Sequence, residues 1–145
     1  MEKLLAKIFS KIKKTPSDVK IYQDLYFMCK EALSQDEVLA IKYIRLLSNI
    51  IENQIVTLLD EEDIRFLFTL HKKVLLLGAP LDFESYLLYV EWERDLDKKF
   101  YVPRRKVLSP TVAAMQDLID DKLDLLTISM PPGTGKSTIG IFFLS

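Results

Sequence analysis

The feature that most constrains this chain is a run near its C-terminal end, LDLLTISMPPGTGKSTIGIFFLS, from Leu123 to Ser145. It begins with an apolar stretch containing β-branched residues, continues through a glycine-rich loop, and ends in a second apolar stretch. This order predicts a buried strand at 123–130, a phosphate-binding loop (P-loop), and a helix beginning near Lys136. A P-loop strand belongs to a parallel sheet covered by helices, so the run predicts the first strand–P-loop–helix of a truncated α/β domain. The expected fold class is mostly α, with a helical bundle ahead of this incomplete domain.

Each residue type in the loop has a physical role in binding an anion. Glycines let the backbone turn tightly and bring N–H groups close to phosphate oxygens. Lys136 is expected to place a positive charge at the β- and γ-phosphates, and the Ser137 hydroxyl is a ligand for Mg²⁺. The positive end of the helix dipole points at the same anion. The predicted cofactors are therefore ATP and Mg²⁺. The predicted binding residues of the loop are Pro132, Gly133, Thr134, Gly135, Lys136, Ser137 and Thr138.

The loop departs from the full P-loop pattern, G-x-x-x-x-G-K-[ST], at its first position. Counting back from Gly135, the leading glycine is expected at position 130, where Met130 stands. The simpler alternative is a Gly/Pro turn followed by a chance Lys-Ser pair. The apolar stretches on both sides match the required strand–loop–helix context and favour the phosphate loop.

Residues 1 to about 100 predict a bundle of four or five helices, because apolar residues recur at helical spacing between cap and break signals. In the first helix Lys3, Lys7 and Lys11 occupy a different face from the apolar stripe. Such a basic amphipathic helix binds a membrane surface or an acidic partner, or lays its apolar stripe on a core. The expected helix signals are Thr15 as a cap with Pro16 and Asp18 in the first turn, a capping box of Ser34 and Glu37, caps at Asp60 and Asp63, a left-handed Gly78, and a cap at Asp82.

Composition limits the other function classes. The formal net charge of −1 gives no overall attraction to nucleic acid or membranes, so any basic effect is local. No apolar run approaches the length of a membrane span. Cys29 is the single cysteine and suits a reducing cytoplasm, and His71 lacks a Cys or His partner at metal-ligand spacing. Trp92 is expected to pack, with a docking role as the alternative.

A basic connector joins the predicted bundle, 1–100, to the start of the predicted ATPase domain, 101–145. Ser109 and Pro110 within it are expected to begin a further helix. The basic cluster either contacts nucleotide or DNA phosphates or is a solvated linker. Its members are Lys98, Lys99, Arg104, Arg105 and Lys106.

The run from Phe100 to Ser145 resembles the start of the ATPase domain of phage terminase large subunits. These proteins place a P-R-R-like stretch and a short helix ahead of an S-x-P-P-x-T-G-K-S loop. The residues that match the loop are Ser129, Pro131, Pro132, Thr134, Gly135, Lys136 and Ser137. The resemblance implies an ATP-driven motor that packages double-stranded viral DNA, forming a homo-oligomeric ring on the portal protein in the host cytoplasm. It also implies a small terminase subunit as partner, and places Arg104 and Arg105 near the adenine.

The residues that follow Ser137 include no second strand and no Walker-B acid, so no catalytic residue is assigned. We therefore expect an N-terminal fragment or truncated gene product that binds ATP weakly or not at all and does not hydrolyse it. Two alternatives stay open. One is a fragment of another P-loop ATPase, such as a helicase or an AAA-type protein. The other is a helical module that docks a portal, a small terminase subunit or DNA.

Overall fold

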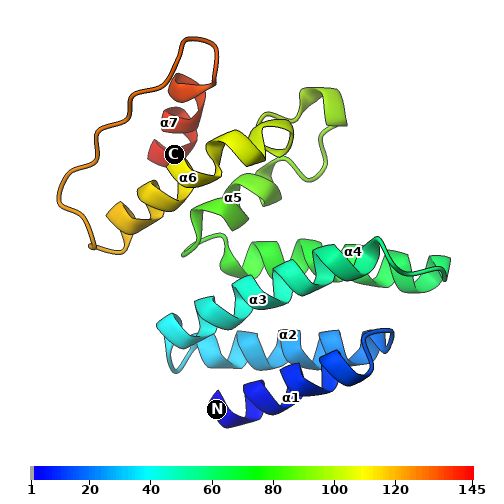
Figure 1. The fold of residues 1–145 in the computed structure, drawn as a ribbon. Helices are drawn as coiled ribbons and strands as arrows, with labels where there is room; N and C mark the ends of the chain where they lie inside the picture. Colours follow the sequence, from blue (N-terminus) through cyan, green and yellow to red (C-terminus); the bar gives the residue numbers. More distant parts are fainter. Residues whose placement is uncertain (1) are drawn as a thin grey trace. The chain divides into compact units, whose positions relative to one another are not determined.

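The computed structural model describes residues 2–145, and every regular element in that range is helical (Figure 1). The chain divides after Leu81 into two units, each with its own apolar core. None of the helices within 2–145 combines the length and the apolar character needed to cross a bilayer. The elements are α1 (Glu2–Lys14), α2 (Val19–Leu33), α3 (Glu37–Ile55), α4 (Glu61–Gly78), α5 (Phe83–Val90), the short 3₁₀ helix η1 (Leu96–Lys98), α6 (Tyr101–Ile119) and α7 (Lys136–Leu144).

The first unit is a helical bundle in which α1 packs on α2, α2 on α3, and α3 on α4, and α2 also contacts α4. Its core is built from aliphatic and aromatic side chains spaced three or four residues apart on each helix. The Tyr22 hydroxyl, on a fully buried side chain, donates to the Pro16 carbonyl at 2.9 Å. The His71 Nε2 and Ser48 Oγ atoms lie 3.2 Å apart inside the same unit. The lone histidine therefore lies in a buried, hydrogen-bonded position.

Aspartates begin four of the helices. The carboxylates of Asp18, Asp36, Asp60 and Asp82 each accept a backbone N–H from the first turn of α2, α3, α4 and α5. Such side-chain caps satisfy N–H groups that have no partner within the helix. The predicted caps at Asp60 and Asp82 are confirmed. Asp63, the second cap expected there, lies inside the first turn of α4, where its N–H donates to Asp60.

Three other predicted helix signals are wrong. The Thr15 hydroxyl bonds back to the Lys11 carbonyl at 3.2 Å, so it does not cap α2. Ser34 ends α2, where its hydroxyl donates to the Glu31 carbonyl at 2.7 Å, and it forms no capping box. Gly78 is buried as the last residue of α4 and is not left-handed. At the first two positions the carboxylates of Asp18 and Asp36 cap α2 and α3 instead.

The second unit contains α5, η1, α6 and α7 around a smaller core. Helix α5, which the sequence pattern grouped with region 1–100, packs on α6. Helix α6 runs without interruption through Pro110, so Ser109 and Pro110 do not begin a helix. A proline removes one backbone hydrogen bond. Here Leu108 and Val112 are buried on either side of it, and their packing keeps the helix continuous.

The expected fold class, a helical bundle followed by the first strand–P-loop–helix of a truncated α/β domain, is wrong at its strand, because the described residues 2–145 form helices and no strand. Segment 123–130 forms a loop between α6 and α7 (the orange arc in Figure 1). Its apolar side chains do alternate, since Leu126, Ile128 and Met130 pack on the core while Leu125 is 81% exposed. A strand, however, is defined by a hydrogen-bonded neighbour. The backbone of 123–130 makes no hydrogen bond to another described segment, so no sheet forms.

Candidate phosphate-binding loop

The loop that leads into α7 has the backbone conformation that its glycines permit. Gly133 and Gly135 have φ angles of 81° and 93°, in the left-handed region where other residues are strained. Between them, the Thr134 hydroxyl donates to the Pro131 carbonyl at 2.8 Å. This hydrogen bond closes the turn, and the positive φ angles at positions 133 and 135 favour glycine at both.

Helix α7 begins directly after this turn, with Gly135 as its N-cap residue. The first helical bond joins the Ile139 N–H to the Gly135 carbonyl at 2.9 Å. The N–H groups of Lys136, Ser137 and Thr138 have no backbone acceptor within 2–145, and no side chain caps the helix. The side chains of these three residues are exposed. A lysine, two hydroxyls and three N–H donors thus lie at the positive end of a helix dipole.

Aromatic contacts hold α7 in place within its unit. Ile139 is fully buried, and the Phe143 ring meets Phe83 of α5 edge-on with centroids 5.4 Å apart. The Phe142 ring stacks on Phe100 at 6.0 Å. These contacts use one side of the helix, so its first turn has a defined position relative to α5 and the start of α6.

Arg104, which the resemblance to terminase large subunits places near the adenine, lies beside Gly135 of the loop. Its guanidinium lies 5.0 Å from the centre of the Phe100 ring and donates to the Phe100 carbonyl at 2.9 Å. A Cβ atom added at Gly135 would lie 2.6 Å from the Phe100 ring and 3.8 Å from Arg104 Cδ. The side chains of Phe100 and Arg104 therefore lie against the loop at Gly135.

Arg105, the next residue in the sequence, pairs with a carboxylate of α5. Its Nε and Nη2 atoms both lie 2.7 Å from Oε1 of Glu84 on α5. Burial raises the pKa of the neighbouring Tyr101, the Glu84 carboxylate adds to this rise, and the Arg105 guanidinium opposes it. Arg105 thus links α6 to α5, whereas Arg104 contacts the loop.

Glu91 fixes the start of α6, where Phe100 and Arg104 lie. The sequence pattern does not indicate this role. Its side chain is fully buried, and its carboxylate accepts N–H groups of Phe100 at 2.7 Å, Tyr101 at 2.8 Å and Val102 at 3.4 Å. It caps α6 in place of the missing local cap, since Phe100 makes no side-chain cap bond. No spacing rule connects a residue to N–H groups nine to eleven positions later, so no local pattern marks it.

The N–H groups, the lysine and the hydroxyls at the start of α7 suit a phosphate better than a bare metal ion. The Ser137 hydroxyl is exposed and fits the role of one Mg²⁺ ligand. No group of three or more His, Cys, Asp or Glu side chains within 2–145 is arranged to hold a metal. Met130, which replaces the leading glycine, packs its side chain on the core of the unit.

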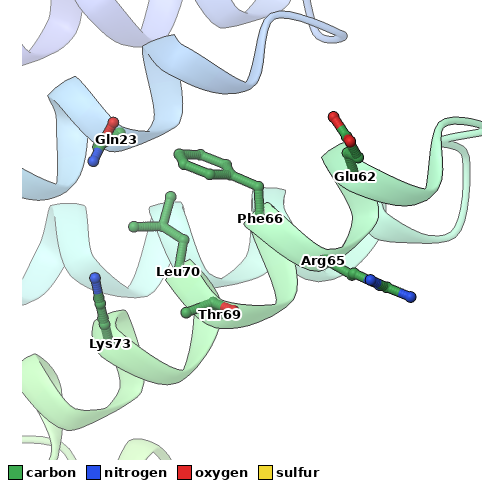
Figure 2. A pocket seen from close by; sticks show the side chains of 7 residues that line it. All are labelled: Gln23, Glu62, Arg65, Phe66, Thr69, Leu70 and Lys73. Carbon is green, nitrogen blue, oxygen red and sulfur yellow. The ribbon is translucent and has the colours of Figure 1, made fainter.

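A separate cleft of about 380 Å³ lies in the first unit, where α4 faces α2 (Figure 2). Phe66 and Leu70 project from α4 toward α2 and provide its apolar part. The remaining lining residues are Gln23, Glu62, Arg65, Thr69 and Lys73. Glu62 is acidic whereas Arg65 and Lys73 are basic, so the lining carries charges of both signs.

In comparisons with known proteins, no family model, no curated protein and no solved structure matches this chain.

Proposed function

We propose that residues 131–138 bind the phosphates of ATP, with Mg²⁺ as the accompanying ion. The observation that carries the proposal is the combination of two left-handed glycines with three unpaired N–H groups at the start of α7. Backbone N–H groups at a helix N-terminus are a general solution for holding phosphate. Lys136, the first residue of that helix, adds an exposed positive charge.

Each loop residue has a distinct role in this proposal. The N–H groups of Lys136, Ser137 and Thr138 hold phosphate oxygens, and the Lys136 ammonium neutralises part of the charge. The Ser137 hydroxyl would supply one ligand to Mg²⁺, whose charge would offset part of the negative charge of the phosphates. Arg104 stands beside the loop, close enough to face a bound nucleotide. No residue is assigned to hydrolysis, so we propose weak binding without turnover.

In its biological role, we propose that the chain contributes to an ATP-driven motor for packaging double-stranded viral DNA. Support comes from the resemblance to phage terminase large subunits, carried by the S-x-P-P-x-T-G-K-S arrangement of Ser129 to Ser137. The proposed partners are the portal protein, a small terminase subunit and viral DNA, in the cytoplasm of the host cell. Retention of the chain on immobilised portal protein tests this role directly.

The loop is tested by titrating the ¹⁵N-labelled chain with Mg·ATP and following the amide resonances of 133–138. We expect these resonances to shift together and the shifts to be much smaller in Lys136→Ala. Losing a charged hydrogen-bond donor costs about 1.5–3 kcal/mol, or roughly ten- to a hundredfold in Kd. Lys122→Ala is the matched control, since Lys122 is exposed and lies outside the loop. Inorganic pyrophosphate is expected to shift the same amides, and adenosine is not.

Two results would contradict the proposal. One is an unchanged set of loop resonances at ~10 mM Mg·ATP, a concentration at which even millimolar binding is visible. The other is an equal response in Lys122→Ala and Lys136→Ala. Steady ATP turnover that disappears in Lys136→Ala would refute the assignment of binding without hydrolysis.

A further inference from the structure

Helix α1 carries a row of lysines along one side. A helix rises about 1.5 Å per residue, so steps of four residues place charges about 6 Å apart along the axis. At about 100° per residue, the four lysines of this row fall within roughly a quarter of the helix circumference. All of them are exposed. The row, called here the lysine face, consists of Lys3, Lys7, Lys11 and Lys14.

The opposite side of α1 is occupied by the core of the first unit. Leu5 is fully buried and Ile12 is 3% exposed. The Phe9 ring lies 5.2 Å from the ring of Tyr43 on α3. The apolar stripe is therefore already packed, and the lysine face lies on the side of α1 opposite the core of the first unit.

The charge of this helix is not balanced locally. Lys3, Lys7, Lys11, Lys13 and Lys14 contribute +5, and Glu2 contributes −1, which gives α1 a formal charge of +4 in a chain whose net charge is −1. None of the five ammonium groups forms a salt bridge with a carboxylate in the part of the chain that the structure describes. On α4, by contrast, Arg65 pairs with Glu61 at 2.6 Å. The positive charge of the lysine face is thus available to an external anion.

We propose that the lysine face binds the phosphate backbone of duplex DNA without sequence preference. A regular row of exposed lysines complements a backbone that carries one negative charge per about 1.7 Å of helix axis. An anionic membrane is the weaker candidate, because surface helices bind bilayers by inserting an apolar face and that of α1 is buried. Single strands are bound by stacking on aromatic rings, and Phe9, the one aromatic residue of α1, packs on Tyr43.

The lysine face does not depend on the proposed nucleotide loop. It lies in the first unit, and the loop lies in the second. Binding of DNA is expected without nucleotide and is expected to survive Lys136→Ala. Failure of one proposal therefore leaves the other standing.

The experiment measures binding of the full chain to a fluorescein-labelled, random-sequence 24-base-pair duplex by anisotropy at several salt concentrations. The test variant is Lys3→Gln/Lys7→Gln/Lys11→Gln. The matched control is Lys30→Gln/Lys42→Gln/Lys73→Gln, which removes the same charge from other helices of the first unit. Each lost phosphate contact lowers the slope of log affinity against log salt by about 0.9, so we expect the slope to fall by about 3. Affinity at 50 mM salt is expected to fall about tenfold or more in the test variant and less than threefold in the control.

Circular dichroism melting curves show whether both variants keep the native fold, which is expected because the substituted lysines are on the surface. Equal loss of affinity in test and control variants overturns the proposal, since it would reflect net charge alone. Absence of DNA binding by the native chain at 50 mM salt overturns it as well. Binding to phosphatidylserine vesicles in the absence of DNA binding assigns the face to a membrane surface and also overturns it.

Discussion

Replacing Gly135 with alanine tests whether the loop and the start of α6 are packed as described. The new Cβ atom would lie 2.6 Å from two carbons of the Phe100 ring. Ordinary carbon contacts are about 3.5–4.0 Å, so the ring or the loop must move by about 1 Å. The ring is confined, because Phe142 stacks on it at 6.0 Å and Arg104 lies over it at 5.0 Å.

Two costs add at this position. A left-handed alanine costs about 1–2 kcal/mol, and inserting a methyl group into a packed contact costs about 1–3 kcal/mol. We expect Gly135→Ala to destabilise the second unit by about 2–5 kcal/mol. Gly133→Ala is the matched control, because Gly133 has a similar φ of 81° but nothing within 4 Å of its added Cβ. It is expected to cost only the backbone strain, about 1–2 kcal/mol.

The assay combines urea unfolding with amide hydrogen exchange at Ile139, whose N–H bonds to the Gly135 carbonyl. Exchange reports the local opening of α7, which a global transition can miss in a chain of two units. Combining Gly135→Ala with Phe100→Ala is expected to cost about 1–3 kcal/mol less than the sum of the single changes. Equal costs for the two glycine variants, or additive costs in the double variant, would refute the packing of Phe100 on the loop.

Two further predictions concern buried groups. Glu91→Gln is expected to lower the free energy of unfolding in urea by about 2–4 kcal/mol, because the carboxylate that accepts three N–H groups is replaced by an amide whose NH₂ group cannot accept them. The control is Glu61→Gln, which breaks an exposed pair with Arg65 and should change stability by less than about 0.5 kcal/mol. Burial raises the pKa of the Cys29 thiol to about 12, so Ellman's reagent at pH 8 should react slowly with the native chain and rapidly in urea. Because the thiol is neutral in the fold and ionises near pH 9 when unfolded, its contribution to stability is constant below pH 9 and declines toward pH 12. Fast native labelling would contradict the burial of Cys29, and unchanged unfolding of Glu91→Gln would contradict its role as a cap.

Some features of the protein were determined by local sequence alone. Periodic apolar residues predicted the helices of the first unit because a helical face can bury only what recurs every three or four positions. Asp60 and Asp82 were recognised as caps because a carboxylate and the N–H groups it accepts lie within three residues. The glycines of PPGTGKST predicted a tight turn before a helix, and Gly133 and Gly135 do adopt positive φ.

Other features were decided only by tertiary structure, since they depend on groups distant in sequence. The apolar stretch 123–130, with its β-branched residues, predicted a strand, but a strand needs a hydrogen-bonded neighbour, and the segment packs instead on the core of the second unit. Pro110 suggested a helix start, yet the burial of Leu108 and Val112 carries α6 through it. The cap that Glu91 provides and the position of Arg104 beside Gly135 both join residues that are distant in sequence, so they depend on the folded chain. Local sequence determines what backbone each segment prefers, whereas packing decides which segments meet.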